Sequence, residues 1–350
     1  MYQIVDFSTC TRVFRSYGGS DRKISVLYDG SVYMLKFQES HEKKSDISSS
    51  YVNNVTAEFI SSHISKSIGL PTHDTILGMY KGDIVVACKD FREKNQSEIE
   101  FSELIHSVYD SKDIKRIPML SQIYSSISDP INALPDNIQK ASIKRYWDMF
   151  VVDALVGNFD RHMGNWSYLT DGKDIELSPI YDYGSTLFPQ LSDEGAKEFL
   201  QDDFRLLERC FVFPSADLCL TREKNGKVGY YDMLNSGFDE NCSKAVLRIV
   251  PKIDLSIIDR IIDDSPFVSE NKKLFYKKII GLRKELLLDI AYQRCKNKDY
   301  DKEALFRVEN EQQYTSSLLR QNMENGSVCM NSEDILPVPL EQEEDGIELE

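Results

Sequence analysis

Segments in which apolar and polar residues alternate are concentrated in the N-terminal part of the chain. Residues 32–37 alternate in this way, and with the strand-like run 24–28 they flank Asp29-Gly30, a dipeptide typical of tight hairpin turns. Residues 75–80 and 83–88 are two further strand-like runs, which flank Lys81-Gly82. A period of two indicates strands with one buried face. We therefore predict two β-hairpins here.

Apolar residues three and four positions apart predict a helix between the two hairpins, and helices dominate from about residue 92 onward. The clearest of them ends at Gly157, since glycine is favoured just beyond a helix C-terminus. It leads into a short predicted hairpin with strands at 166–169 and 174–177. The predicted helices lie at 55–68, 141–157, 194–209, 240–250, 255–263 and 269–296. Beyond about residue 305 the chain is polar and acidic, which indicates a disordered tail.

Composition narrows the class of protein. The chain has 350 residues, of which 41% are hydrophobic and 11% aromatic, as in a folded globular protein with a large core. Its formal net charge is -15, whereas a nucleic-acid partner needs a basic surface. We therefore expect no nucleic-acid partner and no docking on an anionic membrane.

Cysteine and histidine usage indicates a reducing compartment. The seven cysteines are widely spaced without a Cys-X-X-Cys motif, and none of the five histidines pairs with another at metal-ligand spacing. We expect reduced, mostly buried thiols and no zinc site. The first residues lack the pattern of a secretory signal, and no apolar run is long enough to span a bilayer. These features predict a cytoplasmic protein and leave export by a specialised secretion system open.

The most informative motif follows the helix that ends at Gly157. Asp160, His162 and Asn165 lie at fixed offsets in one short loop, and Asp182 follows the predicted hairpin. Phosphoryl transfer needs such a set, because one carboxylate orients the nucleophile and an Asn and a second Asp hold magnesium ions. The alternative is a surface loop whose polar residues cap the helix and the turn.

Three features of the N-terminal part fit a nucleotide site. The paired glycines of Gly18-Gly19-Ser20 allow backbone N–H groups to approach phosphates, although two glycines often make a plain turn. Lys36 ends an alternating strand and either reaches the phosphates or lies on the surface. Glu58, early in the next helix, either pairs with Lys36 or favours the helix dipole.

The remaining candidates flank these features. Cys88 and Lys89 lie between the strand-rich and helical parts, where a hinge would offer backbone groups to adenine. His162 has two interpretations of equal weight: it orients Asp160 or contacts a phosphate, or it hydrogen-bonds the loop backbone. Arg161 is expected to be structural and to pair with a nearby carboxylate.

With these residues in view, the chain resembles the HipA-like kinases, and within them a compact branch, over roughly residues 5–300. The segments that carry the resemblance are Tyr17-Gly18-Gly19-Ser20, Tyr33-Met34-Leu35-Lys36-Phe37, the helix of Glu58, Val86-Ala87-Cys88-Lys89-Asp90-Phe91, Asp153-Ala154-Leu155-Val156-Gly157-Asn158-Phe159-Asp160-Arg161-His162 and Pro179-Ile180-Tyr181-Asp182.

The resemblance implies an α+β, bilobal protein-kinase-like fold with a small β-rich N-lobe at 1–88, a mostly helical C-lobe at 89–304 and the acidic tail at 305–350. It implies ATP and Mg²⁺ as cofactors, and transfer of the γ-phosphate to Ser or Thr hydroxyls of a protein, the chain itself included. By position, it implies Asp160 as the base, with Asn165 and Asp182 as metal ligands. Lys36 and Glu58 correspond to the ion pair, and Gly18, Gly19 and Ser20 to the loop that covers the phosphates.

Departures from the usual kinase pattern keep alternatives open. The order Asp160-Arg161-His162 differs from the usual His-Arg-Asp and is also similar to phosphoinositide kinases, so a lipid or small-molecule substrate is an alternative. No Ala-Pro-Glu follows Asp182. The chain begins almost at the phosphate loop, whereas longer HipA toxins carry an additional N-terminal subdomain, and an antitoxin-like or regulatory partner is therefore left open. A non-catalytic scaffold that binds ATP is the alternative from another class.

Overall fold

The computed structural model describes residues 2–15, 17, 22–38, 53–110, 117–220, 227–302 and 304–306. Residues Met1–Arg307 form one compact unit. The predicted phosphate loop and the predicted acidic tail beyond residue 306 lie outside the described residues. Within the described part, no helix combines the length and apolar character needed to cross a membrane.

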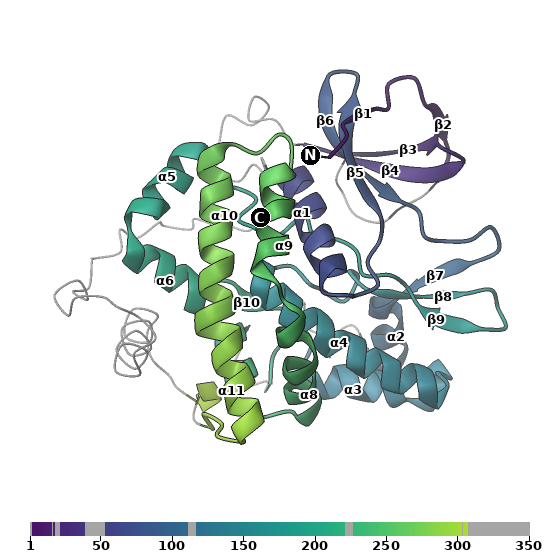
Figure 1. Ribbon diagram of the computed structural model, residues 1–350. Coiled ribbons are helices and arrows are strands. Elements are labelled where there is room, and N and C mark those ends of the chain that lie inside the picture. The colour runs from purple at the N-terminus through teal and green to yellow at the C-terminus, as the bar shows by residue number, and fades with distance from the viewer. Residues whose placement is uncertain are drawn as a thin grey trace, which may run out of the picture. The chain divides into compact units, whose positions relative to one another are not determined.

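A six-stranded sheet makes up the N-terminal part, at the upper right of Figure 1. Its strands in spatial order are β1 (Val5–Asp6), β5 (Thr75–Tyr80), β6 (Asp83–Lys89), β4 (Ser31–Phe37), β3 (Lys23–Tyr28) and β2 (Thr11–Val13). β1 runs parallel to β5, and the other neighbours are antiparallel. The two predicted hairpins are therefore β3–β4 and β5–β6.

Because successive side chains along these strands point to opposite faces of the sheet, one face packs into the core and the other faces the region of the candidate site described below. On β4, residues Tyr33, Leu35 and Phe37 are buried, and Met34 and Lys36 between them are half-buried on the other face. The core residues of the sheet are Phe7, Val26, Tyr33, Leu35, Phe37, Tyr80, Val85 and Ala87. Helix α1 (Asn54–Ser67) lies between the two hairpins in the sequence, as predicted, and packs on β5 and β6.

Helices fill the rest of the unit, at the left and bottom of Figure 1. They are α2 (Phe101–Val108), α3 (Leu120–Ser128), α4 (Asp136–Val156), α5 (Asp193–Gln201), α6 (Asp203–Phe211), α7 (Tyr230–Asn235), α8 (Glu240–Ile249), α9 (Leu255–Asp264), α10 (Glu270–Leu282) and α11 (Ile290–Asn297). Shorter turns are η2 (Pro130–Asn132), η3 (Val250–Lys252) and η5 (Ala304–Phe306), and a strand pair is β10 (Ser215–Ala216) with β11 (Val228–Gly229).

Three boundaries differ from the sequence prediction. The predicted helix at 194–209 is two helices, because Asp202 leaves the helical conformation and caps α6 through its side chain. The predicted helix at 269–296 changes to π-helical hydrogen bonding over η4 (Arg283–Asp289). Helix α4 begins five residues earlier than expected, at Asp136 directly after Pro135.

A second sheet lies beside the large one and was only partly predicted. β8 (Ser167–Thr170) and β9 (Ile175–Leu177) form the expected hairpin. β7 (Ser97–Glu100) pairs with the outer edge of β8 but was missed, since its sequence Ser-Glu-Ile-Glu contains a single apolar residue. Both sheets and the end of α4 thus meet around one region, which holds the candidate site.

Candidate active site

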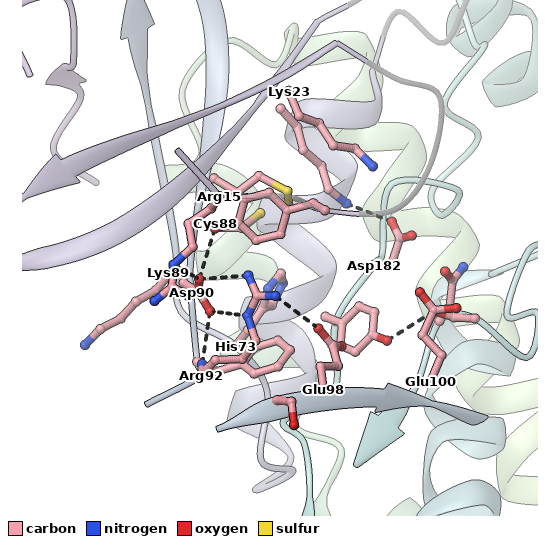
Figure 2. A pocket seen from close by; sticks show the side chains of 18 of the residues that line it. Arg15, Lys23, His73, Cys88, Lys89, Asp90, Arg92, Glu98, Glu100 and Asp182 are labelled. Carbon is pink, nitrogen blue, oxygen red and sulfur yellow. Dashed lines mark hydrogen bonds and ion pairs between the residues drawn. The ribbon is translucent and has the colours of Figure 1, made fainter. Parts of the chain in front are cut away.

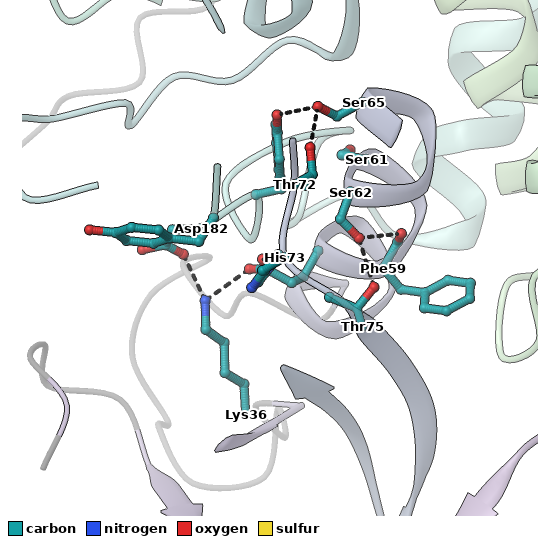
Figure 3. A network of polar contacts seen from close by, with 12 residues as sticks. Lys36, Phe59, Ser61, Ser62, Ser65, Thr72, His73, Thr75 and Asp182 are labelled. Atoms are coloured by element: carbon teal, nitrogen blue, oxygen red, sulfur yellow. Dashed lines mark hydrogen bonds and ion pairs between the residues drawn. The ribbon is translucent and has the colours of Figure 1, made fainter. Parts of the chain in front are cut away.

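Lys36 links the N-terminal sheet to helix α1 and to the loop after β9. Its Nζ lies 2.8 Å from Glu58 Oε2 on α1 and 2.8 Å from Asp182 Oδ1 in the loop after β9. In Figure 3 a dashed line joins the ammonium of Lys36 to Asp182. The alternation of β4 directs Lys36 away from the sheet core. The ion pair that the sequence suggested for Lys36 and Glu58 is present, and Asp182 joins it.

Glu58 is fully buried in α1. Burial alone would raise the pKa of Glu58, but the charge of Lys36 and the neighbouring His73 lower it below its usual value. Burial would likewise lower the pKa of Lys36, but Asp182 and Glu58 raise it well above its usual value. These opposing effects keep Lys36 and Glu58 charged at neutral pH, so the pair has a fixed geometry.

Asp182 has a left-handed backbone conformation, with a φ of 59°. Non-glycine residues adopt this region rarely, and they do so mostly at functional sites and turns. The preceding Ile180 forms a parallel bridge with Thr72 and accepts a hydrogen bond from the backbone N–H of His73. The carboxylate is 38% exposed. Burial alone would raise the pKa of Asp182. The positive charge of Lys36 lowers it by more than burial raises it, so the pKa lies below its usual value.

Arg161 holds the loop after α4 in place. Its guanidinium pairs with both carboxylate oxygens of Asp153, at 2.9 and 3.1 Å, and donates to the backbone oxygens of Asn165 and Tyr181. Burial would lower the pKa of Arg161, but Asp153 raises it above its usual value. The side chain is 7% exposed. Arg161 therefore ties helix α4 to the loop and to the residue before Asp182.

The predicted catalytic residues lie in the loop that Arg161 supports. The side-chain Nδ2 of Asn165 donates a hydrogen bond to the backbone oxygen of Asp160 at 2.7 Å. This bond fixes the orientation of the Asn165 amide, whose Oδ1 is then available as an acceptor or metal ligand. The backbone N–H of Gly164 donates to His162 Nδ1 at 3.0 Å, a contact with the loop backbone. Asp160 donates its own N–H to Asn158 Oδ1. The loop is thus braced from within by short side-chain contacts.

Helix α4 ends in a way that starts this loop. Gly157 is left-handed, with φ 70° and ψ 52°, and its N–H donates to the carbonyl of Asp153. Asn158 follows, fully buried, and donates to Asp153 Oδ1 at 2.9 Å. Asp153 therefore receives bonds from both Asn158 and Arg161, and it sets the direction in which the chain leaves the helix.

One cavity of about 750 Å³ collects these side chains. Figure 2 shows it from close by, with Cys88, Lys89 and Asp90 on one side and Asp182 on the other. Its lining includes Lys36, Asp160, His162, Asn165 and Asp182. Both carboxylates and the amide therefore face a single space, which is large enough for a nucleotide-sized ligand.

The predicted hinge lies at one wall of the same cavity. Cys88 and Lys89 both line it. The N–H of Lys89 donates to Asp74 O and the N–H of Asp90 donates to Val32 O, so the sheet already uses these two amides. A nucleotide base bound at this end of β6 would therefore have to hydrogen-bond to backbone carbonyl oxygens or to the backbone N–H of Phe91.

Several side-chain contacts of the lining were not found from the sequence. Asp90 belongs to the predicted hinge segment, but no role was predicted for its side chain, which is 4% exposed and accepts a bidentate contact from Arg92 at 2.9 Å and a hydrogen bond from Tyr17 at 3.1 Å. Glu98 comes from the missed strand β7, whose sequence forms no motif. His73 likewise comes from an unremarkable polar segment before β5, although its Nε2 lies 3.0 Å from Glu58 Oε1.

The oxygen donors fit a hard divalent cation. Asp182 and Asn165 offer a carboxylate and an amide oxygen toward one cavity, which are the ligand types that Mg²⁺ takes in proteins. The ammonium of Lys36 is bound to Asp182, where a cation would be held. Lys36 and Lys89 both bring positive charge to the lining of the cavity. The three predicted residues of the phosphate loop, Gly18, Gly19 and Ser20, lie outside the described residues.

A strand lysine paired with a helix glutamate, a braced loop with Asp and Asn, and a further Asp around one cavity define a kinase-like fold and site. A model of the HipA-like C-terminal domain matches residues 15–210. The chain belongs to this HipA-like family, as the sequence resemblance predicted.

Known proteins agree with this assignment. The serine/threonine-protein kinase CtkA of Helicobacter pylori strain J99 is 35% identical over 295 residues, which cover 83% of this chain and 88% of the relative. The crystal structure of the H. pylori proinflammatory kinase CtkA matches with a TM-score of 0.78 and 33% identity, covering 85% of this chain and 100% of that chain. The predicted α+β, kinase-like fold is confirmed.

Proposed function

We propose that this chain is an ATP- and Mg²⁺-dependent protein kinase that phosphorylates Ser or Thr hydroxyls, its own included. The observation that carries the proposal is the contact of Lys36 with both Glu58 and Asp182, in a cavity that Asp160 and Asn165 also line. The similarity to a relative named as a serine/threonine-protein kinase supports a protein acceptor.

Each residue has a defined role in this proposal. Mg²⁺-ATP supplies the γ-phosphoryl group, and the metal neutralises the phosphate charges. Lys36, held by Glu58, positions the phosphates through its ammonium. Asp182 and Asn165 hold the cation through oxygen atoms. Asp160 orients the acceptor hydroxyl and takes its proton as the new phosphorus–oxygen bond forms.

The supporting roles follow from the contacts. Arg161 keeps Asn165 and the residue before Asp182 in register through their backbone oxygens. His162 braces the loop by accepting the N–H of Gly164. Cys88 and Lys89 form the wall against which the base lies. The lobes meet in this proposal at the end of β6, with residues 1–88 and 89–304 on either side and 305–350 as a tail.

The partners in this proposal are limited to what the site needs. A protein with an accessible Ser or Thr is the substrate. An antitoxin-like or regulatory partner, like a cytoplasmic location, stays a prediction from the sequence.

The decisive experiment is phosphoryl transfer by the purified full chain. Incubation with Mg²⁺ and ATP should add phosphate to Ser or Thr of the chain, detected by mass spectrometry, and Asp160→Asn should reduce this by at least about a hundredfold. Asp171→Asn is the matched control. Asp171 lies in the β8–β9 turn, where its side chain accepts backbone N–H groups that an asparagine oxygen also accepts.

Two outcomes would contradict the proposal. Equal phosphorylation by Asp160→Asn would remove that carboxylate from the reaction. Stabilisation by Mg²⁺-ATP without turnover, on the chain itself and on a broad panel of proteins, would indicate a binding scaffold. A panel of lipids and small hydroxyl compounds, run in parallel, tests whether the acceptor is a protein at all.

A further inference from the structure

Three potential metal ligands converge behind Lys36 although they are far apart in the sequence. Glu58 lies on α1, His73 precedes β5 and Cys88 lies near the end of β6. Their exposed fractions are 0%, 4% and 2%. One ligand atom from each, a carboxylate oxygen, an imidazole nitrogen and a sulfur, lies within 4.8 Å of the other two. From the sequence we expected no zinc site, because these three residues lack the short spacing of metal ligands.

Two of these atoms are buried without a satisfied hydrogen bond. Glu58 uses Oε2 for Lys36, whereas its Oε1 has no hydrogen-bond partner of proper geometry among the described residues. His73 Nε2 is in the same condition, although the two atoms are only 3.0 Å apart. Buried polar atoms nearly always make hydrogen bonds of good geometry. These two atoms are in close contact without one, so both have electron pairs that a cation between them could use.

We propose that Glu58 Oε1, His73 Nε2 and Cys88 Sγ bind one borderline-soft divalent cation of the Zn²⁺ class, and that its binding inhibits phosphoryl transfer. Sulfur and imidazole donors favour Zn²⁺, whereas Mg²⁺ takes oxygen ligands. The two cation types are therefore directed to different places in one cavity, Mg²⁺ to Asp182 and Asn165 and Zn²⁺ to this cluster.

The distances require little rearrangement. Zinc binds nitrogen and oxygen at about 2.0–2.2 Å and sulfur at about 2.3 Å. Tetrahedral ligand atoms then lie roughly 3.3–3.7 Å apart, so the 3.0 Å between His73 and Glu58 is already close. The sulfur of Cys88 needs to approach by about 1 Å or less. Because His73 and Cys88 line the cavity, the fourth position is open to water.

Inhibition follows from the place of the site, and this half of the proposal rests on the proposed function. The cation would share the carboxylate of Glu58 with Lys36, whose Nζ is 2.8 Å from the other oxygen. The divalent cation together with the Cys88 thiolate adds one net positive charge beside the ammonium, which weakens the hold of Lys36 on Glu58 and displaces Lys36 from the phosphates. Cys88 binds as the thiolate, and its proton is released to solvent.

Cobalt provides a spectroscopic test that is independent of activity. The full chain is titrated with Co²⁺, which gives a thiolate charge-transfer band when a cysteine binds it and visible bands when it is tetrahedral. We expect one equivalent to bind, with both features, and Zn²⁺ to displace it. Cys88→Ser, a nearly isosteric change, should lose the thiolate band.

Matched controls come from other thiols of the chain. Cys10→Ser alters a partly exposed cysteine of the N-terminal part, and Cys329→Ser alters one outside the described residues. Both should bind Co²⁺ like the wild type, and so should their combination. A thiolate band that persists in Cys88→Ser, or one that disappears in a control, would overturn the site.

The second arm measures phosphoryl transfer with Mg²⁺-ATP in excess and rising Zn²⁺. Wild type and Cys10→Ser should be inhibited, with recovery on addition of a zinc-selective chelator. The activity of Cys88→Ser is normalised to its own activity without zinc. This variant should need at least about tenfold more Zn²⁺ than the wild type for the same degree of inhibition. Equal sensitivity of the two thiol variants would overturn the inhibition. Cobalt binding at Cys88 in a chain without any turnover would instead contradict the proposed function and leave the site intact.

Discussion

The ion pair of Arg161 and Asp153 offers a prediction that separates stability from geometry. The two side chains are 7% and 1% exposed and make a bidentate contact. Replacing one partner of a buried pair leaves an uncompensated charge, which costs about 3–5 kcal/mol. We therefore expect Arg161→Met and Asp153→Asn each to lower the free energy of unfolding by about 3–5 kcal/mol.

The double variant has a different expected cost. With both charges removed, no ion is left buried, and the Asn that replaces Asp153 can still accept the hydrogen bond from Asn158. The remaining cost comes from the backbone oxygens of Asn165 and Tyr181, which have lost their hydrogen-bond donor. Each of these oxygens lowers the free energy of unfolding by about 1–3 kcal/mol if it stays buried. The double variant should therefore lose about as much as one single variant, so that the coupling energy between the two residues equals one single loss, about 3–5 kcal/mol.

Equilibrium unfolding in urea measures all four proteins, with the urea dependence of unfolding compared to verify that one transition is followed. A loss in the double variant equal to the sum of the single losses, within about 0.5 kcal/mol, would refute the reasoning, because the two residues would then act independently. Phosphoryl transfer should stay low in the double variant although it is no less stable than either single variant, because the carbonyls beside the catalytic loop lack their donor.

Two further predictions concern charge and backbone conformation. The pKa of Glu58 is held below its ordinary 4.5, so its contribution to stability is present above that pH and is lost as the pH falls through the lowered pKa. In Lys36→Met, burial raises the pKa of Glu58 instead, so the gap in melting temperature between wild type and variant should narrow from pH 7 to pH 5; a constant gap would contradict this. Gly157→Ala should destabilise the protein by at least about 1–2 kcal/mol, because φ is 70° and a Cβ would lie 2.2 Å from the buried guanidinium of Arg283. Thermal unfolding measures this, and a melting temperature like that of the wild type would contradict it.

The local elements were largely predictable from the sequence because their signals are local. Asp29-Gly30 and the alternation of residues 32–37 correspond to the turn and strand of the β3–β4 hairpin. Gly157 ends α4 with a left-handed conformation, as expected for a glycine beyond a helix. The break at Asp202 was missed, because a capping Asp inside an apolar pattern does not interrupt the periodicity.

The candidate site was predictable where its residues form a motif or where, like Lys36 and Glu58, they follow the order of elements in a kinase-like site. Asp160, Asn165 and Asp182 belong to a recognisable spacing, and the structure brings them to the same cavity. Strand β7 could not be predicted from the sequence, because a polar edge strand shows neither alternation nor an apolar run. Glu98 lies on this strand and was therefore missed as well. The roles of the predicted residues stay predictions, for which the variants above provide the measurements.

The hairpins, the helix that ends at Gly157 and the loop that carries Asp160 follow from local sequence signals, because each depends on contacts between near neighbours. That Lys36 contacts Asp182 as well as Glu58, and that Glu58, His73 and Cys88 meet behind it, is visible only in the folded chain. These side chains come from different strands, a helix and a distant loop. Their distances are set by how the sheet packs on α1 and by the bridge between Thr72 and Ile180, and long-range packing of this kind leaves no periodic trace in one sequence.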